Sequence, residues 1–510
     1  MYNVALYNTM PSLVYLRNKS NDRIYVYSNV RSGTKDGKPV YSRRCIGHLD
    51  EKTGEIVPNN TRGSSPTATL KYSGLSDTII QLSERVGLTH TLKVTFGSMW
   101  RDILTCAMYG LTGNTDLSSI ESWCMRFETP SDRILTQKDI EELLSNIDED
   151  GVNAFQRIWR KKVKDRNIMH ISASPAASYD RHSFTSMISA DTDSVMTVDM
   201  DICYGIDTQL PISYNLLPSK VLDLEDIIGS EDRYRWINPT DILYVLNKEY
   251  CEGNNVNVMV VSDRRFTVEL PKDHHMFKTV TDELHDDILT YANYKTSTGG
   301  SNFVNTHVID VSGTPCYAHM YYSAEEAEKE IGSFLTLIEK CRMELVTNHL
   351  VNAHTEIYGK FFDMKGPDMG VELNSNSIME HTKRAGTTII LSDVIVDPIL
   401  ALDYMSLNVF AERTFNDLQN GSDHLKLKLY LRHNLESRYF IQFITLILRS
   451  VIRKCLIDNN LRRDYTVEDV VREINNIALV NMSDRKVPIR TELNFRQRLF
   501  LEALGTDTDE

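Results

Sequence analysis

In some stretches of the chain apolar residues recur at every second position, and in others they recur every three or four residues. Between residues 22 and 49, "DRIYVYSNV" and "VYSRRCIGHL" alternate apolar and polar positions around the turn-like "SGTKDGKP", which predicts two strands joined by a turn. Residues 75–165 instead repeat apolar positions every three or four residues, which predicts helices. Gly87 follows one such segment, and Thr136 stands three residues before Asp139. These positions predict a helix end and a capped helix start.

Residues 167–265 return to strand-like patterns. "NIMHISAS", "SVMTVDMDICYGI" and "LPISYNLLP" predict three strands that follow one another as a meander. "LDLEDIIGS" and "NPTDILYVLNKEYC" predict helices. "VNVMVVSD" then predicts a buried strand added in parallel to the sheet, ending at Asp263 beside Arg264 and Arg265.

The rest of the chain is predicted to be β-rich and then helical. The helix "SAEEAEKEIGSFLTLIEKCRMEL" interrupts the β-rich stretch, and "PILALDYMSLNVFAERTFNDLQN" begins with Pro at a first-turn position. "ESRYFIQFITLILRSVIRKCL" places on one face Phe440, Phe443, Ile444, Ile447, Leu448 and Val451. The patterns divide the chain into six parts: a β-hairpin module (1–62), a helical domain (63–166), the first part of an α/β core (167–265), a β-rich insertion (266–397), two long core helices (398–460) and C-terminal helices (461–510).

Composition is that of an ordinary globular protein. The 510 residues are 41% hydrophobic and 25% charged, and none of the apolar runs reaches the roughly 18 residues that a membrane helix needs. The N-terminus lacks the basic start and apolar block of a signal peptide. The eight cysteines form no CxxC pair, so we expect neither a zinc cluster nor a disulfide framework, and a cytoplasmic location fits best.

The net charge of −14 argues against a dedicated nucleic-acid binder, which usually carries a basic surface. The charge is uneven, however. "RIWRKKVKDR" at 157–166 and "KPVYSRRC" at 38–45 are basic, whereas "DLEDIIGSED" and "TDTDE" are acidic. A basic run is more often a solvated surface than a binding site, so the two interpretations stay open at this point.

Two carboxylates have unusual positions. Asp263 would end a buried strand, and Glu412 lies within a helix whose face also carries Met405, Asn408, Phe415 and Gln419. Each could simply form a local ion pair or cap. Alternatively, carboxylates from a strand end and a packed helix can hold two Mg²⁺ ions roughly 4 Å apart for phosphoryl transfer. That chemistry needs a third carboxylate, normally on the first strand of the sheet.

A series of seven motifs in order resembles the DDE transposases of bacterial insertion sequences, in the insertion-sequence-four-like branch with a β-rich insertion before the last Glu. The motifs run nearly from end to end: "RIYVYSNV…KPVYSRRCIGHLDEKTGEIVP", "FGSMWRDILTCAMYGL" with "LSSIESW", "ICYGIDTQLPISYNLLPSKVLDLEDI", "MVVSDRRF", "CYAHMYYSAEEAEKEIGSFL", "ILALDYMSLNVFAERTFNDLQNGSDHLKLKL…SRYFIQFITLIL" and "RTELNFRQRLFLEALG".

The resemblance implies an α/β fold with a ribonuclease-H-like mixed sheet, and DNA binding by the helical domain 63–166. It implies that Asp263 is the second catalytic Asp, that Glu412 is the catalytic Glu, and that two Mg²⁺ ions bind between them. The first catalytic Asp falls on Ser172, which cannot supply the charge, and Asp180 is the substitute if the strand is shifted. Implied partners are double-stranded DNA, both element ends and target, and a second copy of the chain in a homodimer; no membrane is expected.

Other positions depart from the family pattern. Tyr and Arg or Lys residues of the family's helix are replaced here by Met405, Ser406, Asn408 and Gln419, and a Gly is replaced by Arg265. The candidate DNA-contacting cations are Arg43, Arg44, Arg160, Lys161, Lys162, Arg264, Lys426, Lys428 and Arg438. Three hypotheses remain: an active transposase, a catalytically impaired or domesticated relative that only binds DNA, and an acidic α/β interaction protein.

Overall fold

In the computed structural model the chain divides into two compact units, residues 1–69 with 481–488 and residues 70–480 with 489–510. The structure describes residues 13–18, 22–35, 38–50, 56–58, 68–114, 117–131, 133–165, 167–173, 197–219, 238–251, 255–284, 287–297, 300–364, 371–420, 432–482 and 488–506. Within these ranges, none of the helices is long and apolar enough to cross a membrane. All eight cysteines are free thiols.

The first unit contains a four-stranded antiparallel sheet in the order β1-β2-β3-β4. Its strands are β1 (Leu13–Arg17), β2 (Ile24–Lys35), β3 (Lys38–Leu49) and β4 (Ile56–Pro58). The two strands predicted from the sequence correspond to β2 and β3. Both extend into the stretch predicted as a turn, as far as Lys35 opposite Lys38, because ladder hydrogen bonds are made by backbone groups and polar side chains do not end them.

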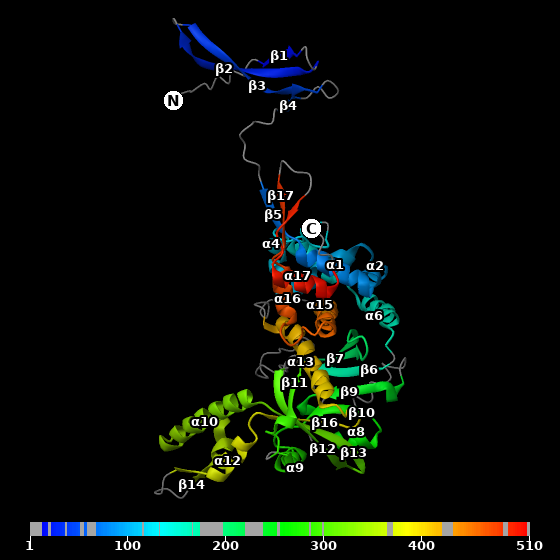
Figure 1. Ribbon diagram of the computed structural model, residues 1–510, viewed down its shortest axis with the longest axis vertical. Helices are drawn as coiled ribbons and strands as arrows, with labels where there is room; N and C mark the ends of the chain where they lie inside the picture. Colours follow the sequence, from blue (N-terminus) through cyan, green and yellow to red (C-terminus); the bar gives the residue numbers. More distant parts are fainter. Residues whose placement is uncertain are drawn as a thin grey trace. The chain divides into compact units, whose positions relative to one another are not determined.

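The second unit begins with helices, as the sequence predicts (Figure 1). They are α1 (Gly74–Val86), α2 (Leu88–Phe96), α3 (Trp100–Leu111), α4 (Ile120–Cys124), α5 (Gln137–Asn146) and α6 (Glu149–Val163). Gly87 ends α1 in the left-handed conformation, with φ of 80°, which a glycine adopts without steric cost. Thr136 and Asp139 form a capping box at the start of α5. The predicted helix end and the predicted helix start are both confirmed.

A mixed sheet of nine strands follows, in the order β11-β12-β13-β16-β10-β9-β6-β7-β8. The strands are β6 (Ile168–Ala173), β7 (Thr197–Gly205), β8 (Pro211–Ser219), β9 (Ile242–Leu246), β10 (Arg265–Glu269), β11 (Tyr294–Ser297), β12 (Gly300–Val311), β13 (Thr314–Tyr322) and β16 (Thr387–Ser392). β6, β7 and β8 form the expected antiparallel meander. β9 pairs in parallel with β6, and β10 pairs in parallel with β9.

Two elements of this region are the reverse of the sequence prediction. The segment "DILYVLNKEYC", predicted as helix, contains strand β9 and the short helix η5 (Lys248–Cys251), whereas "VNVMVV", predicted as strand, lies in helix α8 (Asn255–Val261). All five residues of β9 are buried. In α8 only Val256 and Met259 are buried, three residues apart, as on one face of a helix. In apolar runs this short, hydrophobic periodicity does not distinguish a strand from a helix.

The β-rich stretch after β10 extends the same sheet. β13 and β16 pair with each other, and β16 joins them to β10. The remaining elements of residues 266–397 are mostly helical: α9 (His275–Leu284), α10 (Ala324–Val346), the short helix η7 (Asn352–His354), α11 (Thr355–Phe361), the hairpin β14 (Phe362–Met364) and β15 (Val371–Leu373), and α12 (Ser375–Lys383).

The C-terminal part is again helical, with α13 (Pro398–Asn420), α15 (Arg432–Asp458), α16 (Val467–Ile474) and α17 (Phe495–Leu504). A three-stranded sheet in the order β18-β17-β5 accompanies them, formed by β18 (Ile489–Arg490), β17 (Ala478–Met482) and β5 (Ala68–Tyr72). The face predicted for α15 is buried, with its six apolar residues at most 4% exposed. α15 packs against α3, α5 and α13.

Alternate residues of the central strands belong to two hydrophobic clusters. Ile171 and Val245 join the cluster that contains α13 and α15, whereas Tyr244 and Leu246 join the cluster that contains α8 and α9. Because successive side chains of a strand point to opposite faces, the sheet is a layer with α13 and α15 on one face and α8 and α9 on the other. Figure 1 shows α13 beside the central strands, and α13 contacts β6, β9 and β10.

Candidate functional site

The order of the central strands reverses at β6, which has the parallel strand β9 on one side and the antiparallel strand β7 on the other. In open α/β sheets, ligands bind in the crevice at the carboxyl ends of the strands beside such a reversal. β6 ends at Ala173, and β9 is followed at once by Asn247. These two strand ends therefore define the candidate site.

An amide pair occupies the carboxyl end of β9. The Nδ2 of Asn408 donates a hydrogen bond of 2.6 Å to the Oδ1 of Asn247. Asn408 lies on α13 and is only 1% exposed. Its own Oδ1 is buried without a hydrogen-bond partner among the described residues, and a buried polar atom of this kind usually marks a place for water or a ligand. The site is therefore polar but carries no charge on these two residues.

Helix α13 crosses one face of the sheet, where it contacts β12, β16, β10, β9 and β6. Near its start, the hydroxyl of Tyr321 donates a hydrogen bond of 2.5 Å to the carbonyl oxygen of Pro398. Ten residues later, Asn408 reaches the carboxyl end of β9. Glu412 stands four residues beyond Asn408, one turn further along the same helix face. Its backbone position is consequently close to the candidate site.

A buried arginine holds α13 against its neighbours. Arg453 of α15 is 2% exposed, and burial lowers the pKa of its guanidinium to about 10. It donates to Gln209 Oε1 at 3.0 Å and to Ser406 Oγ at 3.3 Å. The guanidinium groups of Arg449 and Arg453 also lie 5.4 and 5.7 Å from the ring centre of Phe410, which favours cation–π attraction. These contacts fix the rotation of α13 and hence the place of Asn408.

Asp263 does not end a strand, so the structural basis of its assignment is wrong. It lies in an exposed turn after α8, with a left-handed φ of 54°, two residues before β10. Because β9 and β10 are parallel and Arg265 lies opposite Leu243, Asp263 is at the amino edge of these strands. Asn247 is four positions beyond Leu243, roughly 13 Å along the strand. The role of Asp263 as a metal ligand stays a prediction.

The position of the family's first catalytic Asp is occupied here by Ser172, which carries no carboxylate. Ser172 lies in β6, in register with Asp201 of β7. Asp201 is a carboxylate that the sequence reasoning did not consider; it is 1% exposed and lies 3.4 Å from His170 Nε2. Since the ring centre of His170 lies 5.3 Å from that of Tyr244, whose side chain belongs to the cluster with α8 and α9, this pair lies on the face opposite α13. Asp180 lies outside the described residues.

The candidate DNA-contacting cations come from several elements of both units. Arg43 and Arg44 are exposed on β3. The last turn of α6 carries Arg160, Lys161 and Lys162, and burial lowers the pKa of Arg160. Cations in the last turn of a helix also offset its dipole. Arg264 precedes β10 and Arg438 lies on α15, both half-buried; Lys426 and Lys428 lie outside the described residues.

Asn247 is the residue that the sequence reasoning missed. The signal for it was the apolar run "ILYVL" followed by a polar residue, which is typical of a buried parallel strand delivering its last residue to a site. The pattern of "NPTDILYVLNKEYC" instead predicted that Asn247 lies within a helix.

Neither a family model nor a curated protein matches the sequence. Among solved structures, the chain is similar to a piggyBac transposase in a synaptic complex with hairpin DNA, with a TM-score of 0.28 and 8% sequence identity. That similarity covers 81% of this chain and 82% of the other.

Proposed function

We propose that this protein is a DNA-binding relative of DNA transposases whose sheet-edge site no longer holds a pair of catalytic metal ions. The observation that carries the proposal is the Asn408–Asn247 contact at the carboxyl end of β9, in a sheet with three antiparallel strands, two parallel additions and a helix across one face. This arrangement agrees with the ribonuclease-H-like core implied by the resemblance of the sequence.

The amide pair is a poor fit for two Mg²⁺ ions. Mg²⁺ in phosphoryl-transfer sites is held by carboxylates, which also neutralise its charge. The strand end beside α13 offers the neutral Asn247, bonded to the neutral Asn408. Glu412, whose backbone lies one turn beyond Asn408 on α13, is a candidate carboxylate for this place. In the alternative, an active enzyme, Asp263, Glu412 and Asp180 would bind the metal ions, and Asp263 would have to do so from the opposite edge of β9 and β10.

DNA binding would rest on the cations of β3 and α6. Binding of Lys and Arg to phosphates releases counter-ions, so affinity would fall steeply with salt. The net charge of −14 predicts weak binding that needs low ionic strength, because the rest of the surface repels the phosphates. A homodimer and membership of one particular transposase branch remain predictions from the resemblance alone.

The test combines binding and cleavage on the same preparation. Fluorescence anisotropy with a double-stranded oligonucleotide would measure affinity at several salt concentrations, and supercoiled plasmid with Mg²⁺ or Mn²⁺ would report nicking. We expect salt-sensitive binding without nicking. Nicking that disappears in Glu412→Gln would establish the active-enzyme alternative, and absence of binding at low salt would reject a nucleic-acid role altogether.

A further inference from the structure

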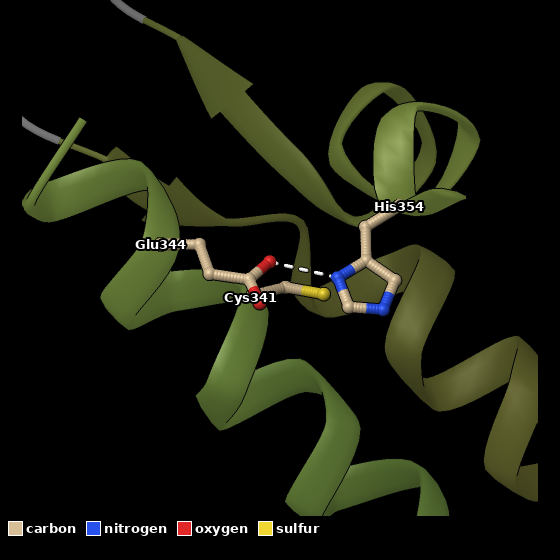
Figure 2. Close-up of side chains that lie close together, drawn as sticks. All are labelled: Cys341, Glu344 and His354. Atoms are coloured by element: carbon tan, nitrogen blue, oxygen red, sulfur yellow. Dashed lines mark hydrogen bonds and ion pairs between the residues drawn. The ribbon is translucent and has the colours of Figure 1, made fainter. Parts of the chain in front are cut away.

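A cluster of three possible metal ligands lies in the insertion, independent of the proposed function. Cys341 and Glu344 are on α10 and His354 ends the short helix η7 (Figure 2). One ligand atom from each lies within 4.8 Å of the other two. Cys341 is fully buried, whereas the side chains of Glu344 and His354 are 12% and 15% exposed, so the cluster opens toward solvent on one side.

The local structure directs these three side chains together. Cys341 and Glu344 are three residues apart on α10, so they lie on the same helix face. The chain then reverses through residues 347–351, and His354 returns beside them: its Nδ1 lies 2.7 Å from Glu344 Oε2. The hydroxyl of Tyr358 donates to the same carboxylate oxygen at 2.5 Å. Figure 2 shows the Cys341 sulfur and the His354 ring pointing toward one another.

The combination of donor types favours zinc. A thiolate, an imidazole and a carboxylate are the ligands that Zn²⁺ takes in proteins, at about 2.0–2.3 Å each. Ligand atoms around one such ion are separated by less than twice that bond length. The spacing in the cluster needs only a small contraction to meet this limit. Hard cations such as Mg²⁺ and Ca²⁺ prefer oxygen ligands alone, so the buried thiol argues against them.

The surroundings supply a reason for a metal. The small hydrophobic cluster around Cys341 contains four buried residues, namely Ile338, Cys341, Phe361 and Phe362. A core of this size gives little stability by itself, and small structural units commonly add a metal or a disulfide. A bound ion would tie the end of α10 to the start of α11 across the connecting turn.

We propose that Cys341, Glu344 and His354 bind one Zn²⁺ ion, with water in the fourth position, and that the ion stabilises the α10–α11–α12 part of the insertion. On binding, the Cys341 thiol loses its proton to solvent and becomes a thiolate ligand. The proton on His354 Nδ1 is lost to solvent and the ring carries its remaining proton on Nε2, so the hydrogen bond between His354 Nδ1 and Glu344 Oε2 is replaced by a bond from each atom to the metal. Tyr358 keeps its hydrogen bond to Glu344 and orients the carboxylate, as outer partners of metal ligands generally do.

The test uses the full chain, stripped with a chelator and titrated with Zn²⁺ and with Co²⁺. Isothermal titration would measure Zn²⁺ affinity, and the thiolate-to-Co²⁺ charge-transfer absorption would report sulfur ligation. We expect one site in the parent. Cys341→Ser should abolish the absorption, and both Cys341→Ser and His354→Gln should weaken Zn²⁺ binding by about tenfold or more.

Matched controls separate this site from other thiols and imidazoles. His349→Gln removes the exposed histidine of the same turn, and Cys455→Ser removes a half-buried thiol on α15; both should behave like the parent. Thermal unfolding provides a second measurement, since Zn²⁺ should raise the melting temperature of the parent and not that of Cys341→Ser. Zn²⁺ affinity and melting shifts that are the same in the parent, Cys341→Ser and His354→Gln would overturn the proposal.

Discussion

The side chain of Asn408 donates a 2.6 Å hydrogen bond to Asn247, joining the middle of α13 to the carboxyl end of β9. The two residues are distant in sequence, and the packing of α13 against β9 brings them together. A site that needs metal would place carboxylates there. The amide pair instead links helix and sheet without charge, which is why we propose that this place does not hold a pair of catalytic metal ions.

Asn408→Ala should destabilise the protein by about 1–3 kcal/mol, because it removes a buried hydrogen bond and leaves Asn247 without this donor. Urea unfolding would measure the change. Asn146→Ala is the control, since the Asn146 side chain is exposed and donates a local hydrogen bond to the Glu142 carbonyl oxygen on the same helix; it should change stability by about 0.5 kcal/mol at most. Equal changes in the free energy of unfolding for the two substitutions would show that the buried Asn408–Asn247 hydrogen bond stabilises the protein no more than an exposed one.

Arg453→Ala should cost about 2–4 kcal/mol, because the side chain fills buried space between α13 and α15. Arg453→Met should recover most of this loss, since the depressed pKa of Arg453 shows that its charge is poorly solvated. Lys454→Ala, one residue further, tests a cation that is 33% exposed and forms an ion pair with Asp458, and it should have a smaller effect. If Arg453→Met were as unstable as Arg453→Ala, the charge of Arg453 and not its packing would account for the lost stability.

Stability should fall in mildly acidic solution through His319. This residue is fully buried on β13, and burial lowers its pKa despite the opposing effect of Asp397. The unfolded chain takes up a proton near the ordinary histidine pKa of about 6.5, whereas the folded chain does not. The free energy of unfolding therefore falls as pH drops from about 6.5 toward the lower folded pKa.

The substitution His319→Gln should flatten that pH dependence, measured by urea unfolding at a series of pH values. In the parent, His319 Nε2 donates to the Ile395 carbonyl oxygen and Nδ1 accepts from Thr306, so the variant will also be less stable at every pH. The exposed His349, changed to Gln, should leave the slope as it is. If the free energy of unfolding of His319→Gln depended on pH as steeply as that of the parent, His319 would not be the source of the pH dependence.

The double variant Lys161→Gln with Lys162→Gln should weaken DNA binding and reduce the magnitude of its salt slope by about 1–2, because each phosphate contact contributes about 0.9. Gln keeps part of the side-chain stem, which matters because Lys162 packs over Gly87. Lys329→Gln with Lys340→Gln removes the same charge from α10 and serves as the control. If both double variants bound DNA with the same affinity and salt dependence, the net charge of the protein and not the α6 cations would determine binding.

Local signals in the sequence predicted much of the fold. Thr136 with Asp139, Gly87 and the apolar face of α15 each depend on neighbours within a few residues, and each prediction is confirmed. β9 and α8 were exchanged because both are short and apolar. What makes "ILYVL" a strand is its burial between β6 and β10, and that pairing is formed by residues far away in the chain.

The candidate site shows the same limit. Glu412 was placed on a helix face by spacing, and its helix is present. The stretch before Asp263 was predicted as a strand but is helix α8, so the predicted place of Asp263 at a strand end is wrong, whereas its role as a metal ligand stays a prediction. Spacing alone also puts Cys341 and Glu344 on one helix face, but His354 joins them only through the turn that follows α10.

Mn²⁺ binding, measured in the parent and three variants, tests the central claim most directly. We predict that the parent and Asp263→Asn bind Mn²⁺ equally weakly at the sheet edge. Asn247→Asp should bind at least about tenfold more tightly because it adds a carboxylate at the carboxyl end of β9, and Asn247→Asp with Glu412→Gln should return to the parent affinity if Glu412 is a second ligand. Tight Mn²⁺ binding by the parent that is lost in Asp263→Asn would contradict the account.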